Sequence, residues 1–297
     1  MKPIVVCFFA IIMLSCKAQQ QPIQLPVNKD DNTLLWQISG KNITTPSYLF
    51  GTFHILCKDD ILLSNHLKTA LQNSATVYFE MDLDDPANTM GGIFFMNMKD
   101  GKKLTDFYTP TEYEKLSNFF KDSLKISLTS LQKMKPMMLE AMLFPKMMPC
   151  KTTSGVELVL MDMAKKANKE IKGFETIAFQ SAMFDSIPYA EQAKSLLKDI
   201  DSLNNYKTML NNMITVYKNQ SVGALMKIMN DTSSNNVLAN NDAFLKNRNI
   251  NWVKQLQQIL PKENIFMAVG AAHLFGEDGL IALLKKEGYT VTPLLNK

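Results

Sequence analysis

Two of the three histidines in this 297-residue chain stand in matching sequence contexts. His54 closes the segment GTFH that begins at Gly51, and His273 closes the segment GAAH that begins at Gly270. Each segment follows an apolar run with strand character, and a Gly at a strand end lets the backbone turn sharply and admits a ligand closely. If the two strands are neighbours in a sheet, both imidazoles lie beyond the carboxyl ends of the strands, where ligands of α/β proteins gather.

A third candidate is Glu80, a carboxylate inside the otherwise apolar run 76–81. An uncompensated buried charge is costly, so Glu80 needs a partner. Two histidines and a carboxylate can hold a divalent metal such as Zn, Mn or Co with a position open for water, and water bound to such a metal becomes a nucleophile near neutral pH. Without metal, the same side chains could act as acid and base. His54, Glu80 and His273 are therefore the candidate catalytic and metal-binding residues.

Two further features support a site. An Asp follows each of these histidines five residues later, as Asp59 and Asp278, which extends the match between the two strand–GxxH–helix–strand units. Arg248 is the only Arg among the 32 basic residues. Lys cannot replace Arg where a planar, bidentate group is required, so Arg248 is a candidate for holding a substrate carboxylate or orienting a ligand acid.

The elements that must position these residues follow from the hydrophobic pattern. We expect strands over residues 34–38, 47–53, 76–81, 170–174, 265–269 and 290–294. Helical spacing covers residues 61–71, 110–148, 156–167, 189–229, 243–260 and 280–287, and the Ser/Asn-rich stretch 231–241 is typical of a loop. The predicted fold is α/β (α+β), with a mixed β-sheet built from the two GxxH units at the chain ends and a helical middle region.

The N-terminus is typical of an exported lipoprotein. The apolar run 4–14 is too short to span a bilayer and leads into the lipobox-like sequence MLSC that ends at Cys16. We predict a signal peptide over residues 1–15, a polar tether over 16–32 from a lipidated Cys16, and one domain over 33–297. The alternative is an ordinary secretory signal in which Cys16 lies near the cleavage point. The expected location is the cell envelope, with the lipid anchoring the protein to a membrane and the domain facing the periplasm or exterior.

Composition and residue distribution bear on the class of protein, its partners and the roles of Met and Cys. A content of 46% hydrophobic and 20% charged residues is that of a globular chain. The net charge of +4, with Lys scattered along the chain, argues against nucleic acid as a partner. The methionines between 134 and 148 favour adaptable core packing or a groove lining over soft-metal binding. Cys57 and Cys150 could form one disulfide, but sequence alone does not show whether they meet.

With these residues assembled, the chain resembles the TraB/GumN family, relatives of the Tiki membrane-anchored proteases. The resemblance covers most of the chain after the tether, and its most specific block is VGAAHLFGEDGL at 269–280. Other matching stretches are LLW at 34–36, YLFGTFH at 48–54, Glu80 with Asp82, Lys135-Pro136, GVE at 155–157, GFET at 173–176, Gln180, Arg248-Asn249 and GYTV at 288–291. The chain departs from the family pattern at Glu157, where Asp is usual.

The resemblance implies roles for particular residues. His54 and His273 would be the histidines required for metal-dependent activity in the Tiki branch, and Glu80 the essential acid. Glu175, Gln180 and Arg248 match further family positions, and Gly51, Gly270 and Asp278 complete the candidate supporting set.

These observations together predict a lipid-anchored, metal-dependent hydrolase, with a peptidase that acts on peptide or protein substrates as the leading interpretation. Two alternatives use the same residues. One is a non-catalytic haem- or metal-binding lipoprotein, since the wider superfamily that the family resembles includes a haem-binding lipoprotein and a Met-lined groove suits an apolar ligand. The other is a metal-independent hydrolase, as in the erythromycin-esterase relatives.

Overall fold

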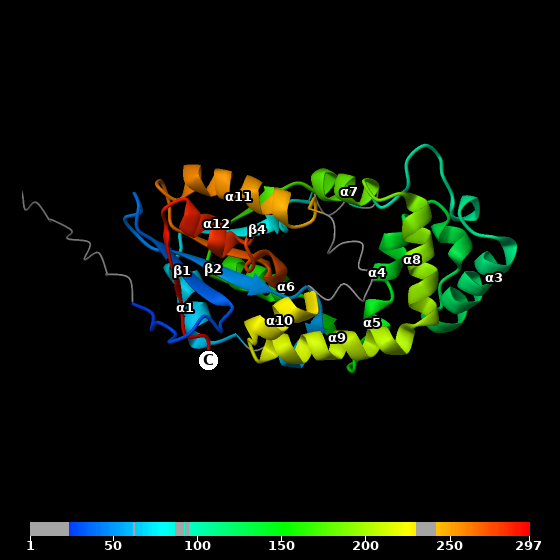
Figure 1. Ribbon diagram of the computed structural model, residues 1–297, viewed down its shortest axis with the longest axis horizontal. Helices are drawn as coiled ribbons and strands as arrows, with labels where there is room; N and C mark the ends of the chain where they lie inside the picture. The colour runs from blue at the N-terminus through cyan, green and yellow to red at the C-terminus, as the bar shows by residue number, and fades with distance from the viewer. Residues whose placement is uncertain (1–23, 62, 87–91, 93–94, 230–241) are drawn as a thin grey trace, which may run out of the picture.

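A mixed β-sheet forms the centre of the α/β part of the molecule (Figure 1). The computed structural model describes residues 24–61, 63–86, 92, 95–229 and 242–297. Within them the sheet has the strand order β6-β4-β7-β2-β1-β8. The neighbours among β6, β4, β7 and β2 pair in parallel, and β1 pairs antiparallel with both β2 and β8, so β1 is the one reversed strand of this described sheet. The strands are β1 (Leu35–Ser39), β2 (Ser47–Thr52), β4 (Thr76–Met81), β6 (Glu170–Glu175), β7 (Ile265–Gly270) and β8 (Thr290–Pro293).

Helices cover both faces of this sheet because successive strand residues point to opposite sides. Phe50 and Phe266 belong to the apolar cluster on one face, and Trp36 and Met267 belong to the cluster on the other. All residues of β2 and β7 are buried, as expected for inner parallel strands covered on both sides. The covering helices are α1 (Asn65–Asn73) and α6 (Val156–Lys166) on the first face, and α11 (Lys246–Ile259) and α12 (Leu280–Lys286) on the second.

The middle of the chain folds into a helical lobe beside the sheet, to the right in Figure 1. Helix α9 runs from this lobe back toward the sheet, and α7 lies between the lobe and α11 (Figure 1). The helices of this region are α3 (Pro110–Phe119), α4 (Pro136–Ala141), α5 (Phe144–Met147), α7 (Ile177–Asp185), α8 (Tyr189–Asp201), α9 (Leu203–Lys218) and α10 (Val222–Met229). Short turns of other helical types are Lys58–Asp60, Leu104–Asp106, Phe120–Leu124, Leu128–Leu131 and Ala271–His273.

Several predicted helix limits were wrong. Helical spacing was predicted over the whole of 110–148, but α3 gives way to a π-helical turn that ends where Lys125 adopts a positive φ of 61°. A new helix then begins at Pro136, because Pro fits the first turn of a helix but not its interior. The helix predicted from residue 61 begins at Asn65, where the Ser64 side chain accepts the backbone N–H of Leu67 as an N-cap.

The predicted fold class is confirmed, with one addition. Strand β6 joins the edge of the sheet from the middle of the chain and pairs in parallel with β4. In the buried part of the methionine-rich region, Met137, Met147 and Met148 pack in apolar clusters, as expected for core filling. The predicted signal peptide, Cys16 and the loop at 231–241 lie outside the described residues. Among the helices that are described, none has the length and apolar character needed to cross a membrane.

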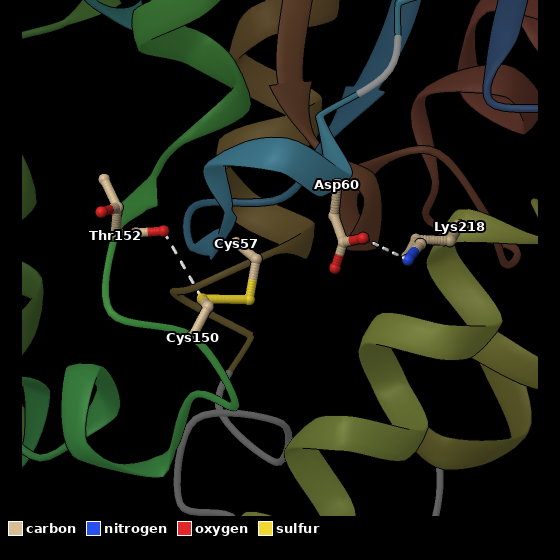
Figure 2. Close-up of a disulfide and its surroundings, with 5 residues drawn as sticks. All are labelled: Cys57, Asp60, Cys150, Thr152 and Lys218. Atoms are coloured by element: carbon tan, nitrogen blue, oxygen red, sulfur yellow. Dashed lines mark hydrogen bonds and ion pairs between the residues drawn. A yellow bond between two sulfur atoms is a disulfide. The ribbon is translucent and has the colours of Figure 1, made fainter.

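A second, small ribbon settles the question of the two cysteines. Strand β3 (Leu56–Cys57) pairs antiparallel with β5 (Thr153–Ser154). Beside this pair, Cys57 and Cys150 form a disulfide with a Cα–Cα distance of 5.8 Å, 93 residues apart in the chain (Figure 2). The disulfide therefore joins the segment after the first GxxH turn to the segment that leads into α6.

Candidate active site of the His-Glu-His centre

The two GxxH turns lie side by side because their strands are neighbours. Strands β2 and β7 pair in parallel, with Gly51 opposite Val269 and Thr52 opposite Gly270. The fit between the turns is tight: a Cβ atom on Gly51 would lie 3.1 Å from both Cα and Cβ of Ala271. Strand β4 lies on the other side of β7 and brings Glu80 to the same carboxyl edge of the sheet.

The side chains of His54, Glu80 and His273 meet above Gly270. A Cβ atom on Gly270 would lie 3.3 Å from Oε1 of Glu80, 3.5 Å from Nε2 of His54 and 3.8 Å from Cδ2 of His273. Glu80 is held there by the backbone N–H of Gly270, which donates to Oε1 over 2.8 Å. The same oxygen lies 3.8 Å from Nε2 of His273. The absence of a side chain on Gly270 therefore leaves room for the three groups to approach one point.

His54 forms the exposed side of this centre. Its side chain is 70% exposed, and Nδ1 lies 2.7 Å from Oε1 of Glu157 at the start of α6. The hydroxyl of Thr52 donates to the same carboxylate oxygen. Desolvation lowers the pKa of His54, but the hydrogen bond and negative charge of Glu157, with a further contribution from Glu80, raise it to about 9. Metal-free His54 is therefore protonated at neutral pH, with its Nδ1 proton directed at Glu157.

His273 forms the buried side, and its neighbours fix its tautomer. The amide nitrogen of Asn249 donates to the backbone carbonyls of His273 and Asp278, so the amide oxygen faces Nδ1 of His273 at 2.7 Å. That oxygen can only accept, so Nδ1 carries the proton and Nε2 carries the lone pair. The ring also packs on Trp252, with centroids 4.4 Å apart. Burial is the main cause that lowers the pKa of His273, to about 3, so the ring is neutral.

Arg248 lies on the buried side of the centre and contacts both of its carboxylates and His273. Its Nε and Nη2 groups donate to Glu175 over 2.7–3.1 Å, and Nη2 also donates to Oε2 of Glu80 over 2.6 Å. Nη1 donates to the backbone carbonyl of Phe244 and lies 3.1 Å from Nε2 of His273. All five N–H groups of the guanidinium are thus engaged. Arg248 therefore contacts the carboxylates of Glu80 and Glu175, and its guanidinium has no free donor for a substrate carboxylate.

Glu175 is the anchor of this arginine. Its side chain is 2% exposed, and it accepts from Arg248, from the indole N–H of Trp252 over 2.8 Å and from the amide of Gln180 over 3.1 Å. The Gln180 amide also lies 3.5 Å from Glu80. A buried carboxylate that accepts from this many donors is held in one orientation. Glu175 and Gln180 therefore belong to the same network as Arg248.

Glu80 remains ionised in this setting. Burial alone would raise the pKa of Glu80, but the charge of Arg248 and the N–H of Gly270 hold it below its ordinary value. Because His273 is neutral, Arg248 is the main cation that keeps Glu80 charged. With both imidazoles neutral, the centre holds the charges of Glu80, Glu157 and Glu175 against that of Arg248, a net charge of −2. Protonation of His54 offsets one of these charges when no metal is bound.

The donor set fits a divalent metal ion by its chemistry. Each histidine gives its Nδ1 proton to an oxygen, of Glu157 or of Asn249, as metal-ligating histidines do. His54 directs Nε2 toward Gly270, whereas His273 presents Cδ2 to Gly270 and its Nε2 faces Nη1 of Arg248. The net charge of −2 matches a divalent cation. In the described part of the chain, however, no group of three His, Cys, Asp or Glu side chains is already arranged to hold a metal. Arg248 contacts both Nε2 of His273 and Oε2 of Glu80, so a metal would compete with it for these atoms.

The remaining predicted supporting residue lies outside this network. The carboxylate of Asp278 is half exposed and pairs with Lys246 over 3.2 Å, and only its backbone carbonyl contacts Asn249. The sequence did not predict the contacts that Glu157, Asn249 and Trp252 make with the two histidines and Glu175. Glu157 and Asn249 did stand in stretches that carry the family resemblance, but nothing in their spacing indicated that they would hold the two histidines.

Fold and site together define an α/β protein in which two histidines, from adjacent GxxH turns, flank a largely buried glutamate. The model of the TraB/PrgY/gumN family matches residues 34–293, and the chain belongs to this family.

Curated relatives were also found among animal proteins. The chain is 22% identical to Metalloprotease TIKI2 of Danio rerio over 89% of its own length and 61% of that protein. It is likewise 22% identical to Metalloprotease TIKI1 of Xenopus tropicalis, over 93% of this chain and 63% of that one. The chain thus spans about three fifths of the length of the curated relatives it matches. No solved structure gave a significant match.

Proposed function

We propose that this chain is a metal-dependent hydrolase that cleaves peptide bonds at the His54–Glu80–His273 centre. The observation that carries the proposal is the convergence of Nε2 of His54 and Oε1 of Glu80 on Gly270, beside the ring of His273, with an oxygen behind each Nδ1. The relatives named as metalloproteases favour a peptide substrate.

Each residue has a defined task in this proposal. His54, His273 and Glu80 would hold the metal, which when bound supplies a Lewis acid that makes water nucleophilic near neutral pH. Glu157 and Asn249 keep the Nδ1 protons of the two histidines, which leaves the lone pair of each ring on Nε2. A metal would have to replace Arg248 at Nε2 of His273. Arg248 orients Glu80, and Glu175 neutralises and fixes Arg248. The exposure of His54 leaves the centre open to a substrate on that side.

We also propose that the protein works in the cell envelope, anchored by a lipid on Cys16. The disulfide between Cys57 and Cys150 supports an oxidising compartment, because such bonds persist outside the cytoplasm and are rare within it. Mass spectrometry of the purified full chain from membranes would test this. A mature N-terminus at an acylated Cys16 is the expected result, and an unmodified Cys16 would contradict it.

Metal content measured by elemental mass spectrometry tests the site. We expect wild-type protein loaded with Zn, Mn or Co to retain close to one metal ion per chain, and His54→Ala/His273→Ala to retain none. Asp278→Asn is the matched control, since its carboxylate faces Lys246 rather than the centre. Hydrolysis of a peptide library by the loaded wild type, lost in the double variant, would complete the test. Equal metal content in wild type and double variant would overturn the proposed site.

A second function is favoured by one contact. Arg248 contacts Nε2 of His273, an atom that a metal would need, which favours a metal-independent hydrolase on the same residues, with His54 and Glu80 available as acid and base. Activity that survives exhaustive chelation would support this alternative over the metal enzyme. A Soret band on adding haem to metal-free protein, lost with His273→Ala, would instead indicate the non-catalytic binding lipoprotein.

A further inference from the structure

A narrow ribbon connects the disulfide to the exposed half of the centre. Residues 53–58 and 152–156 run antiparallel beside each other, with backbone hydrogen bonds from Val156 to Phe53 and from Lys58 to Thr152. Between these bonds lie the paired residues of β3 and β5. One end of the ribbon therefore carries the disulfide.

The other end carries the His54–Glu157 pair. His54 directly follows Phe53 on one segment, and Glu157 directly follows Val156 on the other, as α6 begins. The hydrogen bond from Val156 to Phe53 has a length of 3.1 Å and sets these two neighbours side by side. Glu157 can then reach Nδ1 of His54 over 2.7 Å. Register along the ribbon thus determines whether the carboxylate meets the ring.

We propose that the Cys57–Cys150 disulfide is a positioning element of the site, which fixes the ribbon so that Glu157 holds His54 in its metal-binding orientation. A two-stranded ribbon of this length is marginal by itself, so a covalent link at its end has a large effect on its register. The link also holds together two segments that are 93 residues apart in the chain. Without it, noncovalent contacts alone would have to offset the entropy cost of bringing them together. This inference rests on the proposed function, because the orientation matters only if His54 acts at the centre.

Four variants of the full chain test the proposal. C57S/C150S removes the link, E157Q removes the carboxylate, and C57S/C150S/E157Q removes both. Asp60→Asn is the matched control, because it breaks the neighbouring ion pair with Lys218 and leaves the disulfide intact (Figure 2). The readouts are Zn²⁺ affinity by calorimetry and, in metal-free protein, the pKa of His54 from NMR titration of its ring protons.

We expect C57S/C150S to bind Zn²⁺ about 10- to 100-fold more weakly, as loss of a partner behind a metal-ligating His usually does. The pKa of His54 should fall from about 9 toward its ordinary value of 6.5, as in E157Q, and should stay high in Asp60→Asn. The triple variant should be no worse than E157Q, because the disulfide acts through Glu157.

Two results would overturn the proposal. An unchanged pKa of His54 in C57S/C150S, or losses of affinity that add in the triple variant, would show that packing of α6 alone holds Glu157 and would overturn the proposal. If wild type binds no Zn²⁺, the proposed metal function fails while the titration still decides the role of the disulfide. If C57S/C150S does not fold, reduction of folded wild type with a phosphine before the same titration gives the same decision.

Discussion

The two halves of the centre share a motif and differ in almost everything that governs a histidine. His273 is 4% exposed, stacks on Trp252 and donates to the neutral amide of Asn249, and its pKa is lowered to about 3. His54 is 70% exposed and pairs with the carboxylate of Glu157, and its pKa is raised to about 9. The GxxH sequence therefore places an imidazole at the sheet edge but does not set its protonation state. Burial and the group at Nδ1 set it.

The buried half of the centre, around His273, depends on the pairing of Arg248 with two carboxylates. Breaking this pairing should have the largest effect on the free energy of unfolding. Arg248→Met leaves Glu175, which is 2% exposed, and Glu80 without their cation. Loss of one partner of a buried pair destabilises by about 3–5 kcal/mol. Urea denaturation of metal-free protein would measure this. Arg248→Met/Glu175→Gln should recover part of the loss, and an Arg248→Met protein as stable as wild type would show that the pair is not what braces this half.

The second largest effect is expected when the group that accepts from Nδ1 of His273 is replaced by one like the partner of His54. Asn249→Asp offers His273 a carboxylate, as Glu157 does for His54, and an opposite charge in contact raises a histidine pKa by about 1–3 pH units. We expect the pKa of His273 to rise clearly above 3 in metal-free protein, measured by NMR titration. His54 serves as the internal control in the same spectra. A pKa of His273 that stays at its wild-type value would mean that burial alone dominates this half.

The exposed half of the centre, around His54, should make folding stability depend on pH. This effect should be smaller than those of the two changes in the buried half. The folded pKa of His54, about 9, lies above its unfolded value of 6.5, so its contribution is fully present below pH 6.5 and is lost as pH rises through about 9. We expect the melting temperature of metal-free wild type to fall over this range. The fall should be smaller in His54→Asn, recorded in the same buffers. Identical pH profiles for the two proteins would contradict a Glu157–His54 pair.

The difference between the halves also shows what the sequence could and could not predict. Strand patterns around the two GxxH segments were enough to anticipate the α/β class, because a buried parallel strand must be continuously apolar. Glu80 stood out because a charge interrupts such a strand. The contacts of Glu157 and Asn249 were not predicted, since each residue lies on a helix and its partner histidine is 103 or 24 residues away in the chain. The disulfide could not be predicted for the same reason, because the sequence does not show how far apart the two cysteines lie in the fold.

The smallest effect is expected from the residue that the repeat itself suggested. Asp59 and Asp278 follow the two histidines at the same spacing, yet Asp59 is exposed and the Asp278 carboxylate pairs with Lys246 at the surface. Only the Asp278 backbone carbonyl contributes to the centre, by accepting from Asn249, and a side-chain substitution leaves that contact intact. Exposed ion pairs contribute about 0–1 kcal/mol. Asp278→Asn should therefore change urea stability by no more than about 0.5 kcal/mol, and we expect no measurable change in Zn²⁺ affinity. A marked loss of affinity would mean that this carboxylate acts on the buried half through a rearrangement of α11, and that the two halves are more alike than their contacts indicate.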